Sequence, residues 1–349
     1  MAANQPEPFG VALVGLDHWY NAFPMAEALR ASRLAELRWV IGADAQRARA
    51  VAGQYGAANY ATEVRRALDD PSVQAVVCFT SVDQSADLCV AAAGAGKHLV
   101  SIKPMAMDLE QAGRIVEAVQ RNRVKYFPGS ASYLFFASHQ AFKTWISEGR
   151  IGKLVAAHGV FHAGLPQSWP DRTAPGWFTD PQRVPGGAWI DHAIFIIQAF
   201  RDIFGAEVRR VSGTMGNLKH LDLGVEDYGQ ATLEFSNGGL ATIQSTWLGA
   251  DAAHRQSLEF YGTQGTIVWD TLLGKVALAG QFDSPTPGWS LVDRPADRTA
   301  RATGIIEHLI DCARCDKETL FTVADDRAAL AAALAFYAAA RQGKAVDVL

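Results

Sequence analysis

The sequence predicts two domains, an α/β domain followed by an α+β domain with a large, mostly antiparallel sheet. Its 349 residues exceed the size at which one hydrophobic core stops growing, about 250–300 residues. In the first third of the chain, short aliphatic runs alternate with helical stretches, which is typical of a parallel sheet covered on both faces. In the second half, runs of alternating hydrophobicity are joined by turn residues, which favours antiparallel pairing.

In the first domain we expect five strands separated by helices, after a loose polar tail over residues 1–8. Apolar runs place the strands at residues 11–15, 37–41, 73–79, 98–102 and 124–127. The helices between them are expected to end at residue 31 and to cover residues 45–54, 85–95 and 109–121. The boundary falls near residues 128–132, so the first domain covers residues 9–130 and the second covers residues 131–349.

The second domain begins with a strand at residues 154–162, which leads into a stretch rich in proline, glycine and tryptophan at residues 163–187. An irregular segment of that length inside a compact domain is usually functional. Asn237-Gly238 between two alternating runs is a strong hairpin signal. The remaining elements are a helix at 188–203, strands at 228–235, 240–247, 257–261 and 266–269, and a helix at 324–342 that follows a Thr322-x-x-Asp325 capping pattern.

The composition excludes several classes of function. With 32 basic and 36 acidic residues the net charge is −4, and no long run of one sign offers a footprint for nucleic acid or an anionic membrane. Four cysteines do not make a disulfide framework in a chain of this length, no positively flanked apolar stretch follows Met1, and no run of 18 or more apolar residues is present. We therefore expect a cytoplasmic protein that acts on small molecules, without nucleic-acid or membrane partners.

The first strand ends in a turn that has only part of a nucleotide-binding pattern. In such turns three glycines, spaced G-x-G-x-x-G, allow a tight turn, close approach of pyrophosphate and close helix packing. Here only Gly15 is present, because Asp17 and Tyr20 stand at the other two positions. The acidic residue that would bind the adenosine ribose belongs at the end of the second strand, where Gly42 stands and Asp44 follows. The alternative is that both aspartates only cap helices, and a carboxylate at residue 17 would repel phosphate.

Several segments, taken in order, resemble the Gfo/Idh/MocA oxidoreductase family, which includes glucose-fructose oxidoreductase and inositol dehydrogenases. Residues 95–108 are similar to the family's strand-end Glu-Lys-Pro motif, with Lys103 and Pro104 retained and Ile102 in place of the glutamate. Residues 185–195 resemble the glycine-rich entry to the family's Asp-x-Gly-x-His helix. Further similar segments lie at residues 148–154, 225–247 and 261–267, so the resemblance covers residues 9–347.

The resemblance implies an N-terminal Rossmann domain that binds NAD or NADP and a C-terminal domain with an open sheet. In the family that sheet often mediates contacts between subunits, so a homo-oligomer, either a dimer or a tetramer, is expected. The residues expected at the cofactor follow the first four strands, and they are Gly15, Asp17, His18, Asp44, Thr80, Ser81, Lys103 and Pro104. Arg47 lies close to Asp44 in the sequence, which does not decide between NAD and NADP.

The same resemblance implies catalytic roles for Lys103 and Asp191. Together with His192, these two residues are also expected to bind substrate. Hydride transfer to or from a carbinol needs a group that moves the hydroxyl proton and a charge that stabilises the developing alkoxide. Phe195 stands where the family has its histidine. His192 lies about 60° from Phe195 around the helix and one turn earlier, so we expect His192, tuned by Asp191, to move the proton. The alternative is a histidine that is merely buried and hydrogen-bonded.

Two tryptophans in the proline-rich stretch are further candidates for substrate binding. Trp169 and Trp177 are expected to stack on the apolar face of a sugar or cyclitol ring, and the alternative is that the indoles pin a long loop to its domain. Polar partners for the substrate hydroxyls are available nearby at Asp171, Arg172 and Asp180.

Cys312-x-x-Cys315 has the spacing of a redox or metal site. No second cysteine pair or histidine cluster accompanies it, so we expect core packing and no metal. The resulting hypothesis is an NAD(P)-dependent oxidoreductase acting on a polyhydroxylated small molecule. The alternatives are a catalytically impaired binding or regulatory protein of the same fold, and an NAD-dependent glycosidase.

Overall fold

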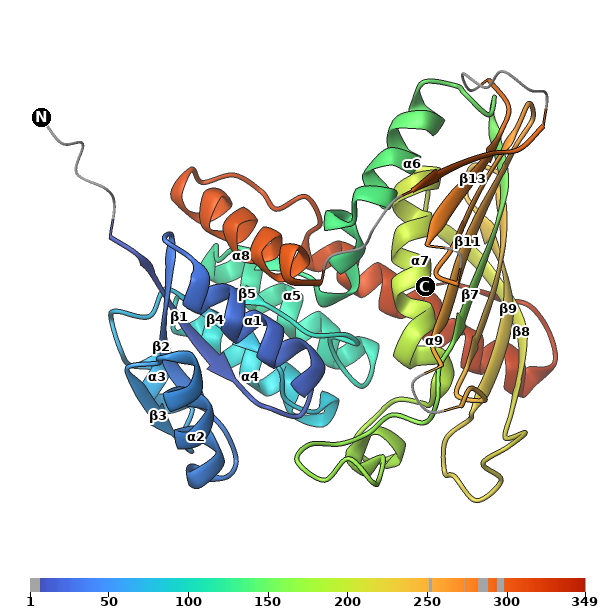
Figure 1. The fold of residues 1–349 in the computed structure, drawn as a ribbon. Coiled ribbons are helices and arrows are strands. Elements are labelled where there is room, and N and C mark those ends of the chain that lie inside the picture. Colours follow the sequence, from blue (N-terminus) through green and yellow to red (C-terminus); the bar gives the residue numbers. More distant parts are fainter. Residues whose placement is uncertain (1–6, 251–252, 273, 282–287, 294–297, 349) are drawn as a thin grey trace, which may run out of the picture. The chain divides into compact units, whose positions relative to one another are not determined.

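The computed structural model describes residues 7–250, 253–272, 274–281, 288–293 and 298–348 (Figure 1). Residues 1–6 of the expected tail lie outside the described residues. The chain forms two compact units. The first contains Met1–Gly129, Ser168–Pro170 and Arg298–Arg327, and the second contains Ser130–Gln167, Asp171–Asp297 and Ala328–Leu349. The units are therefore not two consecutive blocks of sequence.

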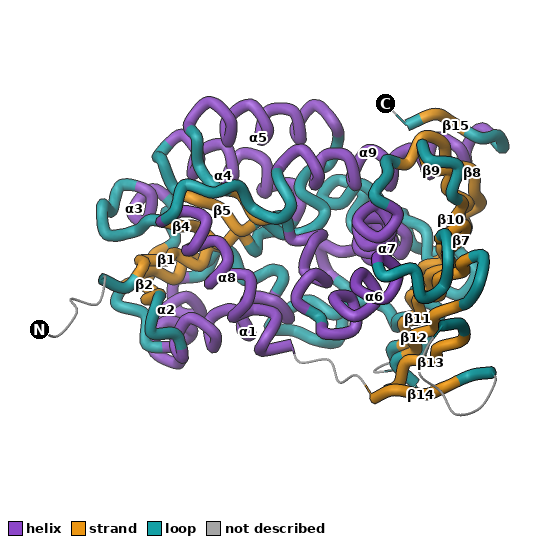
Figure 2. Tube along the Cα trace, turned by 90° about the horizontal axis from the view of Figure 1, so that it is seen from above, coloured by secondary structure: helices purple, strands orange, loops and turns teal. Residues whose placement is uncertain are grey.

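The first unit is built on a six-stranded parallel sheet with the order β3-β2-β1-β4-β5-β6. Its strands are β1 (Phe9–Val14), β2 (Ala35–Ile41), β3 (Asn59–Ala61), β4 (Ala75–Cys78), β5 (His98–Val100) and β6 (Tyr126–Phe127). Its helices are α1 (Trp19–Ala31), α2 (Ala45–Tyr55), α3 (Arg65–Leu68), α4 (Val82–Gly94), α5 (Leu109–Asn122) and α8 (Arg298–Arg314). The helices α4 and α5 cover one face of the sheet, while α1, α2 and α8 cover the other (Figure 2). This doubly wound order is that of dinucleotide-binding domains and confirms the predicted class.

Local sequence explains where these elements begin and end. β1 is buried along its whole length, as expected for a central strand between two layers of helices. α5 begins after Asp108, whose carboxylate accepts a hydrogen bond from the Gln111 amide at 2.8 Å. α2 ends at Gly56, which adopts the left-handed conformation with φ 74°. The sequence does not predict β3 or α3, because three and four residues are too few to show a period.

The second unit is built on a nine-stranded sheet with the order β14-β13-β12-β11-β7-β10-β9-β8-β15. β7 and β10 pair in parallel and the other neighbours pair antiparallel, which confirms a mostly antiparallel sheet. Its strands are β7 (Leu154–His162), β8 (Val208–Gly216), β9 (Tyr228–Phe235), β10 (Leu240–Thr246), β11 (Arg255–Gly262), β12 (Thr266–Asp270), β13 (Lys275–Ala279), β14 (Ser290–Asp293) and β15 (Val346–Asp347). The helices α6 (Ala137–Ser147) and α7 (Ala188–Phe204) lie along one face of this sheet (Figure 1). The other face is bare of described helices along β7, β10 and β11 (Figure 2).

Small residues on the sheet allow α7 to lie close to the strands. A Cβ atom added at Gly159 would lie 2.5 Å from Ile196 of α7, and one added at Gly229 would lie 2.9 Å from the Cβ atom of Trp189. Trp189 is fully buried and stacks on Phe336 of α9 (Val323–Gln342), with ring centroids 4.0 Å apart. The position of α7 in the second unit is therefore fixed by close packing on both sides.

Two turn signals of the sequence are confirmed. Gly238, in the turn between β9 and β10, has φ 86°, as an Asn-Gly hairpin requires. At the start of α9 the Asp325 carboxylate accepts a hydrogen bond from the Thr322 amide at 2.8 Å, and the Asp325 amide donates to Thr322 Oγ1 at 3.4 Å, which together form a capping box. No helix of the described residues is both long and apolar enough to cross a membrane.

Candidate active site

The loops that follow β1 and β4 meet where the strand order of the first unit reverses, which is where open α/β sheets bind ligands. Gly15 has φ 86°, and a Cβ atom there would lie 2.4 Å from the amide nitrogen of Thr80. The Gly15 amide donates to the carbonyl oxygen of Ile41 at the end of β2, at 2.9 Å. One glycine is therefore enough to bring the ends of three neighbouring strands together.

Asp17 and His18 join the same two loops. The Asp17 carboxylate accepts a hydrogen bond from the amide of Ser81, the N-cap residue of α4, at 3.2 Å. His18 is 1% exposed, and its Nδ1 lies 3.0 Å from the carbonyl oxygen of Thr80. The N-cap residue of α1 is His18, without a side-chain capping bond. One oxygen of the Asp17 carboxylate therefore connects the loop after β1 to the loop after β4.

Thr80 supplies a test of whether these loops fit a dinucleotide. Its side chain is buried, and among the described residues its Oγ1 has no hydrogen-bond partner. A buried hydroxyl without a partner costs about 1–3 kcal/mol, so the polar atom at this edge of the sheet is suited to a ligand. The Thr80 hydroxyl and the tight turn at Gly15 together fit the pyrophosphate part of NAD or NADP.

We expect Gly15→Ala to lower the free energy of unfolding by about 1–3 kcal/mol, because its φ is strained for an L-residue and its Cβ would displace the Thr80 backbone. The measurement is urea unfolding. The matched control is Gly53→Ala in α2, where a Cβ meets nothing within 4 Å, and which should gain about 0.5–1 kcal/mol. Wild-type stability of Gly15→Ala would contradict the strained turn.

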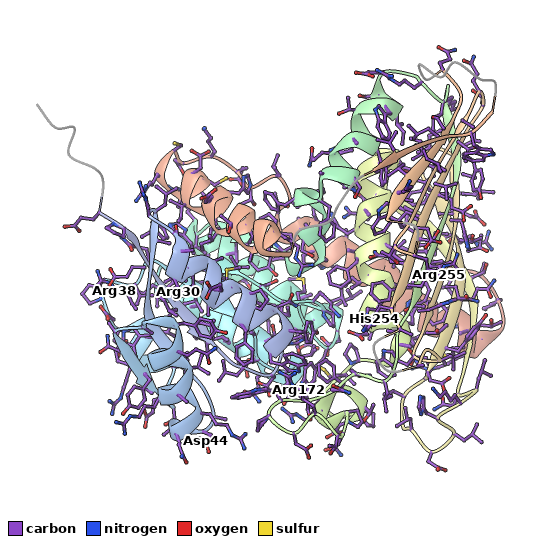
Figure 3. The ribbon with its side chains drawn as sticks, in the orientation of Figure 1. Arg30, Arg38, Asp44, Arg172, His254 and Arg255 are labelled. Carbon is purple, nitrogen blue, oxygen red and sulfur yellow. The ribbon has the colours of Figure 1, made fainter. Side chains whose placement is uncertain are left out.

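Asp44 lies at the beginning of α2, on the surface of the first unit (Figure 3). Its carboxylate accepts a hydrogen bond from the Arg47 amide at 2.8 Å, so it caps the helix as one of the two interpretations expects. A second carboxylate oxygen remains next to the end of β2, the position of a ribose ligand in dinucleotide folds.

Lys103 follows β5 by three residues and is buried in the first unit, with 2% of its surface exposed. The peptide bond between Lys103 and Pro104 is cis. Ser101, two residues before Lys103, belongs to a buried hydrogen-bonded cluster with Tyr126 and Asp326 that the sequence did not predict. The Tyr126 hydroxyl donates a hydrogen bond to the Asp326 carboxylate at 2.7 Å, and its oxygen lies 2.6 Å from Ser101 Oγ. Asp326 is fully buried, and burial with this carboxylate raises the pKa of Tyr126 well above its usual value.

Asp191 and His192 lie in the first turns of α7, in the second unit. The Asp191 carboxylate accepts a hydrogen bond from Trp247 Nε1 at 3.1 Å, and His192 Nε2 lies 3.3 Å from the same oxygen. The His192 ring stacks on Phe161 of β7, with centroids 3.8 Å apart and planes 12° apart. The structure therefore brings these two predicted residues together as a carboxylate–imidazole pair, with Phe161 on one face of the ring and the carboxylate beside Nε2.

Comparison with known proteins agrees with this geometry. Residues 9–130 match the oxidoreductase family with an NAD-binding Rossmann fold, and residues 139–268 match the Gfo/Idh/MocA C-terminal domain. The chain belongs to the Gfo/Idh/MocA family of NAD-binding oxidoreductases. It is 31% identical over 249 residues to 1,5-anhydro-D-fructose reductase of Ensifer adhaerens, covering 66% of this chain and 71% of that protein. It is 25% identical over 279 residues to levoglucosan dehydrogenase of Pseudarthrobacter phenanthrenivorans, covering 72% and 69%.

Solved structures share the fold of this Gfo/Idh/MocA oxidoreductase. Levoglucosan dehydrogenase in complex with NADH superimposes with a TM-score of 0.87 at 20% identity, over 98% of this chain and all of that one (100%). An oxidoreductase domain protein from Kribbella flavida gives a TM-score of 0.86 at 19% identity, over 98% and 99%. The two-domain fold class is therefore confirmed, and the description of the matching family gives NAD as the cofactor of its Rossmann fold.

In this Gfo/Idh/MocA oxidoreductase, Glu226 fixes the start of α7, and sequence reasoning missed it. Its carboxylate accepts hydrogen bonds from the amides of Gly187 at 2.9 Å and Trp189 at 3.0 Å, and from the Tyr337 hydroxyl at 2.9 Å. Burial raises the pKa of Glu226 although these hydrogen bonds oppose the shift. Glu226 thus caps from another element the helix turn that carries Asp191.

The two tryptophans of the proline-rich stretch lie in different units. Trp169 belongs to the first unit, where it contacts Phe23 and Arg47. Trp177 belongs to the second unit, is 6% exposed and stacks on Phe178 with centroids 4.0 Å apart. Phe178 belongs to the same stretch, so both interpretations of Trp177, a platform for a sugar ring and an indole that pins the loop, stay predictions.

The polar residues of that stretch stabilise turns. The Asp171 carboxylate accepts hydrogen bonds from the Thr173 hydroxyl at 2.6 Å and amide at 2.9 Å, which lower its pKa. The Asp180 carboxylate accepts one from the Gln182 amide at 2.9 Å. These hydrogen bonds form within single turns and do not test substrate binding. The role of the two carboxylates in binding substrate therefore stays a prediction.

The cysteines of the Cys-x-x-Cys pair lie in different environments. Cys312 is buried and Cys315 is exposed. The Cys312 thiol donates to the carbonyl oxygen of Glu318 at 3.4 Å, whereas that of Cys315 donates to Asp311 at 3.4 Å. The two side chains therefore have separate partners in the first unit.

Proposed function

We propose that this oxidoreductase moves a hydride between NAD or NADP and a hydroxyl-bearing carbon of a sugar, a cyclitol or a related polyhydroxylated molecule. The observation that carries the proposal is the Asp191–His192 pair, in which His192 Nε2 lies 3.3 Å from a carboxylate that also binds Trp247. The names of the two relatives reported above support the substrate class, because each refers to a cyclic polyhydroxylated compound.

Each of the three proposed catalytic residues has a separate task. When bound, the nicotinamide ring accepts or donates the hydride. We assign to Lys103 the stabilisation of negative charge on the substrate oxygen, because a buried ammonium acts strongly where water is excluded. We assign to His192 the removal of the hydroxyl proton in oxidation and its return in reduction. Asp191 orients the imidazole and stabilises its protonated form.

A panel of sugars and cyclitols, incubated with NAD⁺ and NADP⁺ and followed by absorbance of the reduced cofactor, tests the proposal. Oxidation of at least one member at a rate typical of enzymes supports it. Cofactor binding without turnover of any member would favour the impaired binding protein. Cleavage of a glycoside without net reduction of NAD⁺ would favour the glycosidase.

We expect His192→Ala to lower kcat/KM for oxidation by about 100- to 10,000-fold and to abolish its fall at acid pH. The reason is that only the neutral imidazole can accept the hydroxyl proton, so the wild-type rate declines as the ring becomes protonated. The measurement is the pH profile of kcat/KM. The matched control is His158→Ala, whose ring binds Thr242 on the sheet and whose loss should leave the profile unchanged.

A second variant tests whether the reaction rate depends on the position of the imidazole along α7 or only on its presence. Adding Phe195→His to His192→Ala places an imidazole one turn later, where the family has its histidine, and should restore part of the lost rate. An unchanged profile in His192→Ala would remove that residue from the mechanism.

We also propose a cytoplasmic homo-oligomer, a dimer or tetramer that forms through the sheet of the second unit. Support for the oligomer comes from the sheet face opposite α6 and α7, which is bare of described helices along its central strands (Figure 2). Support for the compartment comes from the four cysteines, all of which are thiols. Light scattering that gives the mass of a single chain would contradict the oligomer.

A further inference from the structure

Trp169 lies against two helices of the dinucleotide-binding unit. The segment Ser168–Pro170 belongs to the first unit, although its neighbours in the chain belong to the second. The centroid of the Trp169 ring is 5.4 Å from that of Phe23 of α1, with the planes 81° apart, which is an edge-to-face contact. The guanidinium carbon of Arg47 lies 5.8 Å from the same ring, within the range of a cation–π contact. Trp169 thus bridges α1 and the first turn of α2.

These contacts lie where a dinucleotide fold receives the adenosine ribose, at the carboxyl end of β2. Asp44 follows β2 by three residues and caps α2 through the Arg47 amide. The guanidinium of Arg47 is exposed and forms no ion pair within the part of the chain that the structure describes. A planar cation held by an indole at this place is suited to stack on adenine or to bind a 2′-phosphate.

We propose, resting on the proposed function, that Trp169 and Arg47 form one wall of the adenosine-ribose subsite of the cofactor. Trp169 holds the guanidinium, and Arg47 interacts with the substituent at the ribose 2′ position. The sequence-based expectation placed Trp169 on the sugar substrate. Its contacts with α1 and α2 assign it to the cofactor instead.

ADP-ribose separates these assignments, because it contains the adenosine half of the cofactor and lacks the nicotinamide. We expect Trp169→Ala to weaken binding of NADH and of ADP-ribose by the same factor, roughly fivefold to 30-fold, measured by isothermal titration calorimetry. Arg47→Ala should weaken 2′-phospho-ADP-ribose more than ADP-ribose, since the extra phosphate carries the charge that a guanidinium binds. The matched control is Trp289→Ala, an exposed tryptophan of the second unit, which should change neither affinity.

The outcomes distinguish this inference from the proposed function. Unchanged ADP-ribose affinity in Trp169→Ala would overturn the inference and leave the proposed function intact. A wild-type protein that binds neither NADH nor ADP-ribose would overturn both. Weaker binding in Trp169→Ala, in a protein that oxidises no sugar or cyclitol, would support the inference and count against the function. Trp169→Phe keeps an aromatic face for the guanidinium and should bind more tightly than Trp169→Ala, which separates this contact from a general loss of folding.

Discussion

Replacing Lys103 with methionine is expected to lower kcat/KM by about 100- to 1,000-fold, the usual cost of removing one group that stabilises a developing oxyanion. Methionine has a similar length and no charge, so the change removes the ammonium and leaves the volume. Lys103 is itself expected at the cofactor, but the loops proposed to hold the pyrophosphate follow β1 and β4. NADH affinity should therefore fall much less than kcat/KM. Steady-state kinetics and a calorimetric titration with NADH measure the two quantities separately.

A second buried lysine of the same unit provides the matched control. Lys97 Nζ donates hydrogen bonds to the carbonyl oxygens of Asp70 at 2.9 Å and Val73 at 2.7 Å. Lys97→Met should therefore lower stability by about 1–3 kcal/mol and leave kcat/KM unchanged. If Lys103→Met instead lost stability and kept its rate, Lys103 would be a structural lysine. The proposed mechanism would then have no group that stabilises negative charge on the substrate oxygen.

The elements that sequence reasoning placed best are those with a strong local period. β7 has the predicted bounds, Leu154–His162, and α9 begins at its predicted capping pattern. α8 was missed because Gly304 interrupts its apolar positions and because glycine disfavours helix interiors. β8 was missed because serine and glycine residues dilute the apolar pattern over its second half.

Of the candidate site, only the residues that belong to contiguous sequence motifs were predicted. Lys103 and the Asp191–His192 pair were found through a strand-end motif and a helix motif. Asp326 and Glu226 were not found, because Asp326 binds a tyrosine 200 residues away and Glu226 caps amides 37 and 39 residues away. Such partners are brought together by the tertiary fold, so the local spacing of residues in the sequence does not predict them.

Glu226→Ala is expected to have the largest effect on stability, about 2–4 kcal/mol, because it leaves the buried amides of Gly187 and Trp189 without an acceptor. It should also lower kcat, since those amides begin the turn that holds Asp191. NADH binds in the first unit, so its affinity should change little. Urea unfolding, steady-state kinetics and a binding titration test these three statements.

The pH dependence of this loss distinguishes Glu226 from an ordinary capping residue. Burial raises the folded-state pKa of Glu226 above its usual value of 4.5. The folded state therefore holds the proton more tightly than the unfolded chain, and the stability that Glu226 contributes is greatest below the unfolded pKa and declines as pH rises through the folded one. The difference in unfolding free energy between wild type and Glu226→Ala should accordingly be larger at pH 5 than at pH 8.

A partly exposed glutamate of the same sheet, Glu234, provides the matched control for the stability effect of Glu226→Ala. Glu234 of β9 pairs with Arg209 at 3.5 Å, and the two side chains are 38% and 68% exposed, so Glu234→Ala should cost less than about 1 kcal/mol. Glu226→Gln keeps one oxygen acceptor but turns an amide N–H₂ group toward the second backbone donor, so it should recover only part of the loss. Because α7 carries both members of the carboxylate–imidazole pair, a Glu226→Ala protein with wild-type stability and rate would mean that close packing on β7 and α9 alone orients the pair.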